Sequence, residues 1–231
     1  MSSPISAAST TEHRRSRRGL PAGPALLAVF AILVLAAVGV SQRAPSFSAG
    51  WADAPAELRA VLWPEPLPIG AFELLDQRER PFGPEQLKGR WSFLFFGYLQ
   101  CPDVCPTAMQ LLREFRLGLA AAYPGGLEHQ VVFVSVDPAY DRPAQIAAYL
   151  NHFDPEFVGL SGRPEALARL AGPLAIKYFE YVDEQGRRSI DHTSSIMIVD
   201  PLGRVIGAFP PPQRPEKILT LFLSLRRHLS I

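Results

Sequence analysis

An apolar run, WSFLFFGY, occupies residues 91–98 of the chain. It contains five aromatic residues and almost no polar group, and turn-forming residues bound it on both sides. A run of this kind is typical of a strand that is buried on both faces, as in the middle of a sheet covered by helices. The run therefore predicts the central strand of a sheet.

Segments with helical and strand patterns alternate along the chain around this run. Residues 106–122 have apolar side chains at helical spacing, and residues 131–136 form a second apolar run. This order predicts an α/β domain with a central mixed sheet and helices on both faces. The other expected elements are a hairpin at 71–75 and 80–82, a helical turn at 84–87, helices at 141–152, 163–170 and from 215 onwards, and strands at 157–160, 178–182, 194–199 and 205–209.

The N-terminal region has the features of a membrane anchor. Residues 1–21 form a basic tail that contains Arg14, Arg15, Arg17 and Arg18, and residues 22–41 form an apolar segment just long enough to span a bilayer. By the positive-inside rule, the tail is predicted to be cytoplasmic and the rest of the chain to lie outside, in an oxidising compartment. A cleaved secretory signal is the alternative, but no convincing A-x-A site follows residue 40, so the uncleaved anchor is favoured.

Composition separates a tether from the folded domain. Residues 42–66 are rich in proline, serine and glycine, which predicts a tether with one short helix at 56–62, and residues 67–231 are expected to form the domain. Four arginines and one glutamate give residues 1–20 a net charge of +3, and the 19 basic and 21 acidic residues of the remainder give −2. A nearly neutral outer domain argues against nucleic acid as a partner.

The two cysteines of the chain, Cys101 and Cys105, directly follow the apolar run, in the sequence CPDVC. Such a pair can close a structural disulfide, bind a soft metal or exchange with another disulfide. A structural disulfide would close so short a loop that it would stabilise the chain little. Thioredoxin-type redox motifs have two residues between the cysteines, and the three residues here leave room for an ion, which favours a metal such as Cu(I).

Any third, nitrogen ligand must come from the five histidines of the chain. His129 and His152 are interpreted as solvated residues near helix ends. His192 precedes the apolar strand in the polar segment 191–195, which is expected to be a loop at the site; an ordinary loop histidine is the alternative. Asp103, Asp137 and Asp191 are candidates for supporting positions around the ligands.

Four segments of the chain resemble the Sco/SenC copper-chaperone family. They are FFGYLQCPDVCPT at 95–107, VFVSVDPAYDRP at 132–143, FDPEFVGLSG at 153–162 and DHTSSIMIVDPLGRVIGAFP at 191–210. The combination of CPDVCP with the later DH sequence is far more specific than any single segment. The resemblance covers most of the chain from about residue 67 to the C-terminus.

The resemblance implies a thioredoxin-like domain anchored in a membrane and facing the periplasm or the intermembrane space. It implies that Cys101, Cys105 and His192 bind copper, as Cu(I) or Cu(II), for assembly of the binuclear copper centre of cytochrome c oxidase. The partner would be the copper-accepting subunit of the oxidase or another copper or thiol protein. The chain is thus expected to be a metallochaperone at the inner membrane rather than an enzyme; the alternative is a thiol-disulfide oxidoreductase that reduces the cysteines of such a partner.

Overall fold

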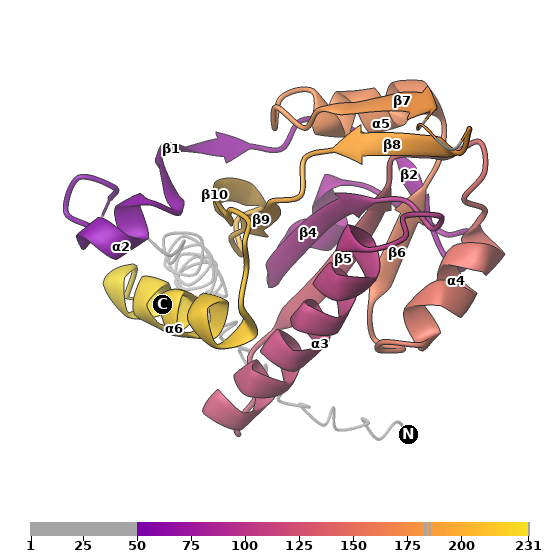
Figure 1. Cartoon of the computed structure of the whole chain (residues 1–231). Helices are drawn as coiled ribbons and strands as arrows, with labels where there is room; N and C mark the ends of the chain where they lie inside the picture. Colours follow the sequence, from indigo (N-terminus) through magenta and orange to yellow (C-terminus); the bar gives the residue numbers. More distant parts are fainter. Residues whose placement is uncertain (1–49, 183, 185, 231) are drawn as a thin grey trace, which may run out of the picture. The chain divides into compact units, whose positions relative to one another are not determined.

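The computed structural model describes residues 50–182, 184 and 186–230 (Figure 1). The predicted cytoplasmic tail at 1–21 and the predicted membrane anchor at 22–41 lie outside the described residues. In the part of the chain that is described, no helix combines the length and the apolar character that crossing a membrane requires.

A mixed sheet forms the centre of the domain and, among the described residues, has eight strands in the order β1-β10-β9-β4-β5-β6-β2-β3. Strand β4 (Trp91–Gly97), the predicted central strand, is buried along its whole length. It runs parallel to β5 (His129–Ser135) and antiparallel to β9 (Ile196–Val199), so the predicted mixed sheet is confirmed. The other strands of this sheet are β1 (Leu62–Pro68), β2 (Leu74–Asp76), β3 (Pro81–Phe82), β6 (Val158–Ser161) and β10 (Arg204–Phe209).

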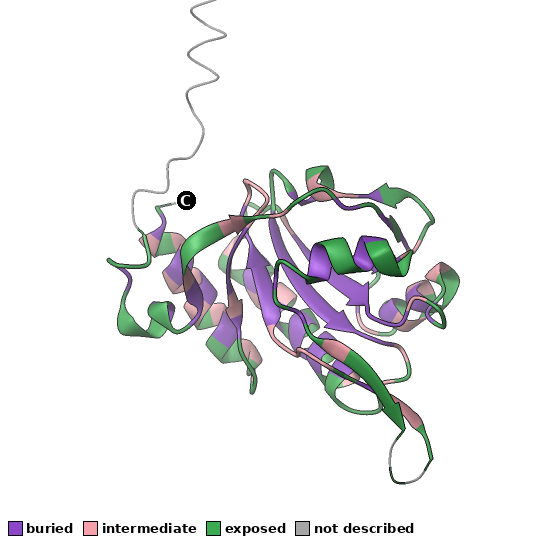
Figure 2. Ribbon diagram, turned by 90° about the horizontal axis from the view of Figure 1, so that it is seen from above, coloured by how far each residue is buried: buried purple, intermediate pink, exposed green. Residues whose placement is uncertain are grey.

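Helices flank this sheet on both faces. Helices α3 (Val104–Ala122) and α6 (Pro215–His228) lie against the face that Phe93 enters, where the Phe93 ring centroid is 4.7 Å from that of Phe115 and 5.1 Å from that of Phe222. Helix α5 (Pro164–Ala171) lies on the opposite side of the buried strands in both views (Figure 1 and Figure 2). The remaining helices are α2 (Ala56–Arg59), the 3₁₀ turn η1 (Pro84–Leu87) and α4 (Pro143–Asn151).

The centre of the sheet has the thioredoxin-like arrangement. Helix α3 connects the parallel strands β4 and β5, the antiparallel pair β9 and β10 returns on the other side of β4, and α6 follows β10. Because β4 and β5 are parallel, their carboxyl ends meet at one edge of the sheet, where loops collect ligands and reactive groups. The segment CPDVC begins at this edge.

The prediction of a tether at residues 42–66 is wrong for the C-terminal part of that segment. Strand β1 adds to the edge of the sheet, with Leu62 paired to Gly207 and Leu67 to Val205, and Leu58 of α2 is fully buried. The prolines that made this segment resemble a linker are tolerated because β1 is an edge strand and need not donate every backbone hydrogen bond. The folded domain therefore begins before residue 67.

The segment around His192 also differs from the expectation. Residues Arg188–His192 form strand β8, which pairs with β7 (Tyr178–Val182) as a separate two-stranded hairpin, so His192 ends a strand and does not lie in a loop. Only Ile190 of β8 is buried, and a strand with one buried apolar side chain leaves little periodicity to detect. This hairpin lies beside the carboxyl edge of the main sheet (Figure 1).

Candidate metal centre

The two cysteines occupy the connection between β4 and α3. Helix α3 begins at Val104, two residues earlier than the sequence predicted, so Cys105 lies in its first turn, where unpaired backbone N–H groups favour negative charge. Cys101 lies in the preceding loop and is half-buried, whereas Cys105 is fully buried. Neither cysteine is part of a disulfide.

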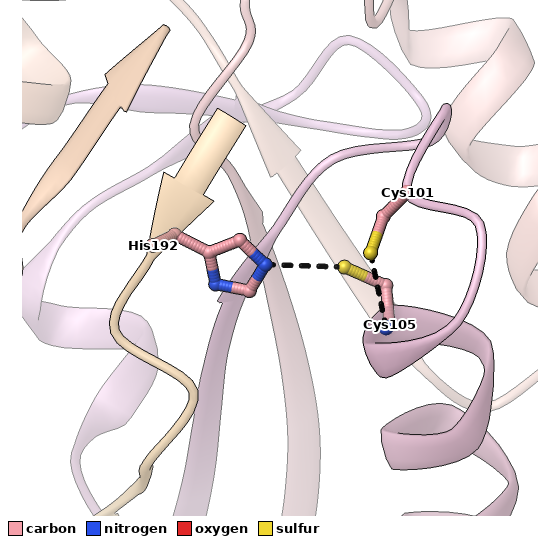
Figure 3. A group of neighbouring side chains, drawn as sticks. All are labelled: Cys101, Cys105 and His192. Carbon is pink, nitrogen blue, oxygen red and sulfur yellow. Dashed lines mark hydrogen bonds between the residues drawn. The ribbon is translucent and has the colours of Figure 1, made fainter. Parts of the chain in front are cut away.

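The three sequence-predicted ligands come together in space (Figure 3). The backbone N–H of Cys105 donates to Cys101 Sγ over 3.3 Å, and Cys105 Sγ lies 3.5 Å from His192 Nε2. The two sulfurs and one ring nitrogen all lie within 4.8 Å of one another. Among the described residues, this is the group of cysteine, histidine and carboxylate side chains that could hold a metal ion.

Hydrogen bonding and burial separate the two thiols. The side-chain hydrogen bond with Cys105 is the largest cause that lowers the pKa of Cys101, to about 4; burial opposes it, and His192 and the backbone N–H groups of Cys105 and Asp103 add to it. The pKa of Cys105 is raised by the same hydrogen bond, by burial and by the negative charge on Cys101. At neutral pH the pair therefore carries one proton: Cys105 is a thiol and Cys101 is a thiolate.

His192 is fixed with Nε2 toward the sulfurs. Its Nδ1 lies 3.2 Å from the carbonyl oxygen of Thr193, which can only accept, so Nδ1 donates this hydrogen bond and Nε2 faces the sulfurs. The rings of Phe95 and Tyr98 meet the imidazole edge-on, with centroids 5.9 and 6.0 Å away. An imidazole held by its second nitrogen in this way is typical of a histidine ligand.

Gly97, at the end of β4, is a site residue that the sequence analysis missed. A Cβ atom at this position would lie 2.8 Å from Cys105 Sγ and 3.0 Å from the Phe133 ring, closer than such atoms approach. The absence of a side chain therefore makes room for the Cys105 sulfur. A glycine at the end of an apolar run was the available signal, because an isolated glycine in a strand often marks a close approach.

The three predicted supporting carboxylates have different positions. Asp103 is exposed and stands before α3 without a side-chain cap, and Asp191 is exposed on β8. Asp137 is buried but is not part of the ligand group; it forms a two-point ion pair with Arg188, at 2.6 and 2.9 Å. Apart from the backbone N–H of Asp103, which bonds to Cys101, no hydrogen bond joins these three residues to a ligand side chain within the described part of the chain. Their predicted supporting role therefore remains a prediction.

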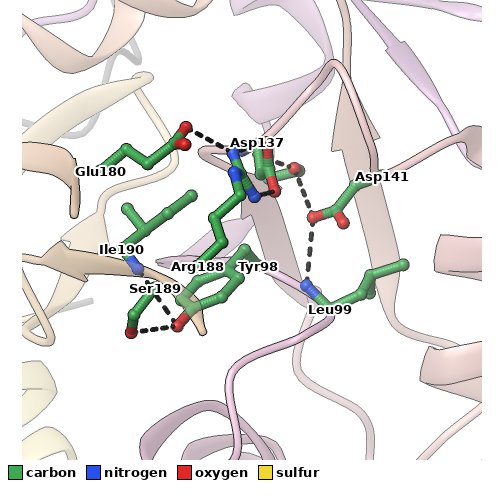
Figure 4. A network of polar contacts seen from close by, with 9 residues as sticks. Tyr98, Leu99, Asp137, Asp141, Glu180, Arg188, Ser189 and Ile190 are labelled. Carbon is green, nitrogen blue, oxygen red and sulfur yellow. Dashed lines mark hydrogen bonds and ion pairs between the residues drawn. The ribbon is translucent and has the colours of Figure 1, made fainter. Parts of the chain in front are cut away.

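A polar network holds the β7–β8 hairpin over the site (Figure 4). Arg188 of β8 bridges Asp137, which follows β5, and Glu180 of β7, at 2.7 Å. The Tyr98 hydroxyl lies 3.2 Å from Ser189 Oγ and accepts the N–H of Ile190. Both contacts attach the strand that carries His192 to the end of the sheet that carries the cysteines.

Asp141 belongs to the same network and was missed as a site residue, because Asp-Arg-Pro was interpreted only as a helix start. Its Oδ2 accepts the Ser135 hydroxyl at 2.7 Å and the N–H of Leu99 at 3.1 Å, which fixes the loop that leads to Cys101. Burial raises the pKa of Asp141 to about 6, with the charge of Asp137 adding to the effect. The hydrogen bonds from Ser135 and Leu99 and the charge of Arg188 oppose this rise.

Two sulfurs and one imidazole nitrogen form a donor set that suits a soft metal ion. The fold and this trio define the class of protein: a thioredoxin-like domain with a potential two-cysteine, one-histidine metal site. A family model described as SCO1/SenC matches residues 65–225, more than half of the chain. The chain belongs to the SCO1/SenC family.

Individual relatives agree with this assignment. A "Putative copper-binding protein" of Stutzerimonas stutzeri is 36% identical over 156 residues, which cover 68% of this chain and 76% of that protein. The structure of Bradyrhizobium japonicum ScoI with copper bound has a TM-score of 0.60 at 32% identity, covering 70% of this chain and 99% of that one. Yeast Sco1 with copper bound has a TM-score of 0.63 at 26% identity, covering 70% and 90%.

Proposed function

We propose that this protein binds one copper ion through Cys101 Sγ, Cys105 Sγ and His192 Nε2 and delivers it to a partner. The observation that carries the proposal is the convergence of these three atoms within 4.8 Å. The copper-bound relatives from Bradyrhizobium japonicum and yeast support copper as the metal. Copper is the cargo here, and the half-exposed Cys101 offers the ligand that an acceptor can replace first.

The proposed destination is the binuclear copper centre of cytochrome c oxidase, with the copper-accepting subunit of the oxidase or another copper or thiol protein as partner. The proposed location is the inner membrane, with residues 22–41 as a single anchor and the domain facing the periplasm. Support for the location comes from the sequence, since four arginines precede an apolar segment of spanning length.

Copper titration of the reduced, full-length protein tests the metal site. We expect one equivalent of Cu(II) to give sulfur-to-copper charge-transfer absorption, because two thiolates would bind the ion. His192→Ala should weaken binding and shift this absorption, whereas His152→Ala, an exposed histidine at the end of α4, should change neither. Absorption that persists when Cys101 and Cys105 are both replaced by alanine would exclude the site.

A thiol-disulfide reductase is the second candidate, favoured by the unequal thiols. The Cys101 thiolate would attack a partner disulfide and release one partner thiolate, and the Cys105 thiol would lose its proton and attack Cys101 Sγ, releasing the second. The partner disulfide gains two electrons, and the pair becomes a Cys101–Cys105 disulfide that no longer binds copper. If reduction of a partner disulfide is unchanged in His192→Ala, exchange does not depend on copper; if it falls with copper binding, the two activities share one site.

A further inference from the structure

A second hollow lies at the end of the sheet opposite the cysteines. This pocket has a volume of about 550 Å³ and is lined by the β2–β3 hairpin, the start of β5 and the segment before β6. Arg90 directly precedes β4 and His129 begins β5, so both mark the amino ends of the central strands. Cys101 follows the carboxyl end of β4, and the pocket is therefore separate from the proposed copper site.

The wall of this pocket carries more unpaired positive than negative charge. Four arginines line it; Arg80 pairs with Asp76 at 2.7 Å, and Arg116 Nε pairs with Asp154 at 2.6 Å. Arg78 and Arg90 form no ion pair within the described part of the chain. The remaining acidic residue of the wall is Glu156, whose carboxylate likewise has no ion pair with a described residue.

The hairpin turn holds the Arg78 backbone in place while its side chain remains unpaired. The buried carboxylate of Asp76 accepts the backbone N–H of Arg78 at 2.8 Å and that of Arg80 at 2.9 Å, together with the Arg80 side chain. Burial alone would raise the pKa of Asp76, but these hydrogen bonds lower it overall, so its charge is retained and neutralised within the turn. The Arg78 guanidinium is left to bind something else.

His129 provides a second sign of a missing ligand. It was predicted to be a solvated residue near a helix end, but it begins β5 and its Nδ1 lies 2.6 Å from the Leu127 carbonyl oxygen. Its Nε2 is buried and has no hydrogen-bond partner among the described residues. Buried polar atoms of folded proteins are nearly always bonded, so the unpartnered nitrogen of this pocket-lining residue calls for a water or ligand atom close to it.

We propose that this pocket binds a phosphate-bearing small molecule. The two unpaired guanidiniums outweigh the one unpaired carboxylate of the wall, and arginine binds phosphate oxygens through paired N–H groups. The terminal nitrogens of Arg116 and the ring of His129 supply further polar atoms to the same wall. The volume lies within the range of small-molecule sites, and Phe82 and Val158 provide apolar surface for an organic group.

Calorimetric titration of inorganic pyrophosphate into the full-length protein in a non-ionic detergent tests this proposal. We expect saturable binding that weakens about tenfold or more in the Arg78→Ala, Arg90→Ala double variant, because each change removes a charge-assisted hydrogen bond. Glu156→Gln should strengthen binding by removing a like charge. Arg163→Ala, an exposed arginine before α5, is the matched control and should bind as the unchanged protein does.

Two phosphate sources are distinguished by competition. If a monomeric short-chain phosphatidylglycerol displaces pyrophosphate and the phosphatidylcholine of equal chain length does not, the site takes an anionic lipid headgroup. If neither displaces it, the site takes a soluble phosphorylated molecule. The proposal is overturned if neither pyrophosphate nor phosphatidylglycerol binds at millimolar concentration, or if binding is the same in the double variant.

Discussion

The two cysteines differ in both exposure and charge, although they stand in one short motif. Cys101 is half-buried and receives hydrogen bonds, whereas Cys105 is enclosed between the end of β4 and the first turn of α3. A thiolate reacts and binds metals far more readily than a thiol. Cys101 should therefore be the first of the two cysteines to react with a disulfide or to bind a metal ion.

Alkylation of the reduced, metal-free protein measures this difference. Because its pKa is lowered to about 4, Cys101 should be a thiolate at neutral pH and should lose reactivity toward iodoacetamide only as the pH falls toward that value. Cys105, whose pKa is raised, should react slowly throughout. At about pH 6, mass spectrometry should find the label at Cys101, whereas urea-unfolded protein should label both residues slowly and equally. Equal labelling of the folded protein would contradict the assignment.

The sequence predicted which residues could bind a metal ion, but it did not predict the residues that surround them. Cys101 and Cys105 stand out because they are the two cysteines of the chain, and their spacing favours a metal. His192 was singled out by its position in a polar segment before an apolar strand, and the family resemblance decided between a ligand and an ordinary histidine. Gly97 carried a local signal that was not used, whereas Tyr98 contributes through its contact with Ser189, 91 positions away, which spacing within one segment cannot reveal.

At the element scale, the β7–β8 hairpin positions His192 from outside the main sheet. The Arg188–Asp137 ion pair connects residues 51 positions apart and joins the hairpin to the end of β5. The Arg188 guanidinium also lies 4.2 Å from the centroid of the exposed Tyr140 ring. Since β8 contributes one buried apolar side chain, core packing of this strand is sparse and the polar contact adds to it.

Replacing Arg188 should loosen this hairpin. Arg188→Met keeps much of the apolar stem but leaves the buried Asp137 carboxylate unpaired, at a cost of about 2 kcal/mol or more. We expect faster hydrogen exchange at the amides of β7 and β8 and weaker copper binding, because His192 would no longer be fixed. Hydrogen exchange with mass spectrometry measures the first effect and copper titration the second.

Two variants make that result interpretable. Adding Asp137→Asn to Arg188→Met removes the unpaired charge, so overall stability should partly recover while the hairpin remains loose. Arg163→Met tests the loss of an exposed arginine elsewhere and should leave exchange unchanged. Unchanged hairpin exchange in Arg188→Met would show that other contacts hold β8.

Elements with strong apolar periodicity were predicted well, and those held by a few contacts were not. The central strands and α3 were expected within a few residues of their observed bounds because their side chains enter one core. Strand β8 is polar apart from Ile190, and β1 contains three prolines, so neither has a strand pattern. Both are strands because of pairing with distant segments, which the local sequence does not encode.

At the scale of the whole molecule, the N-terminal edge of the domain depends on β1 and α2. Ala54, Leu58, Val61 and Leu62 are buried, and the Val61 carbonyl accepts the N–H of Ala208 at 2.8 Å. A Cβ atom at Gly207 would lie 2.0 Å from the Val61 carbonyl oxygen, so only a glycine at this position of β10 lets the segment approach so closely. Residues 50–68 are therefore part of the folded unit and cover what would otherwise be an open sheet edge.

Two truncated chains test this boundary. A chain that begins at residue 50 should be more stable than one that begins at residue 69, by roughly 3 kcal/mol or more, because the shorter chain exposes the surface that Leu58, Val61 and Leu62 cover. Urea denaturation followed by circular dichroism measures the difference, and the shorter chain should also associate through the exposed edge of β10. In the longer chain, Leu58→Ala should reproduce part of the loss, about 2 kcal/mol or more, without opening the edge. If both chains unfold at the same urea concentration, residues 50–68 act as a tether after all, and the domain is complete without them.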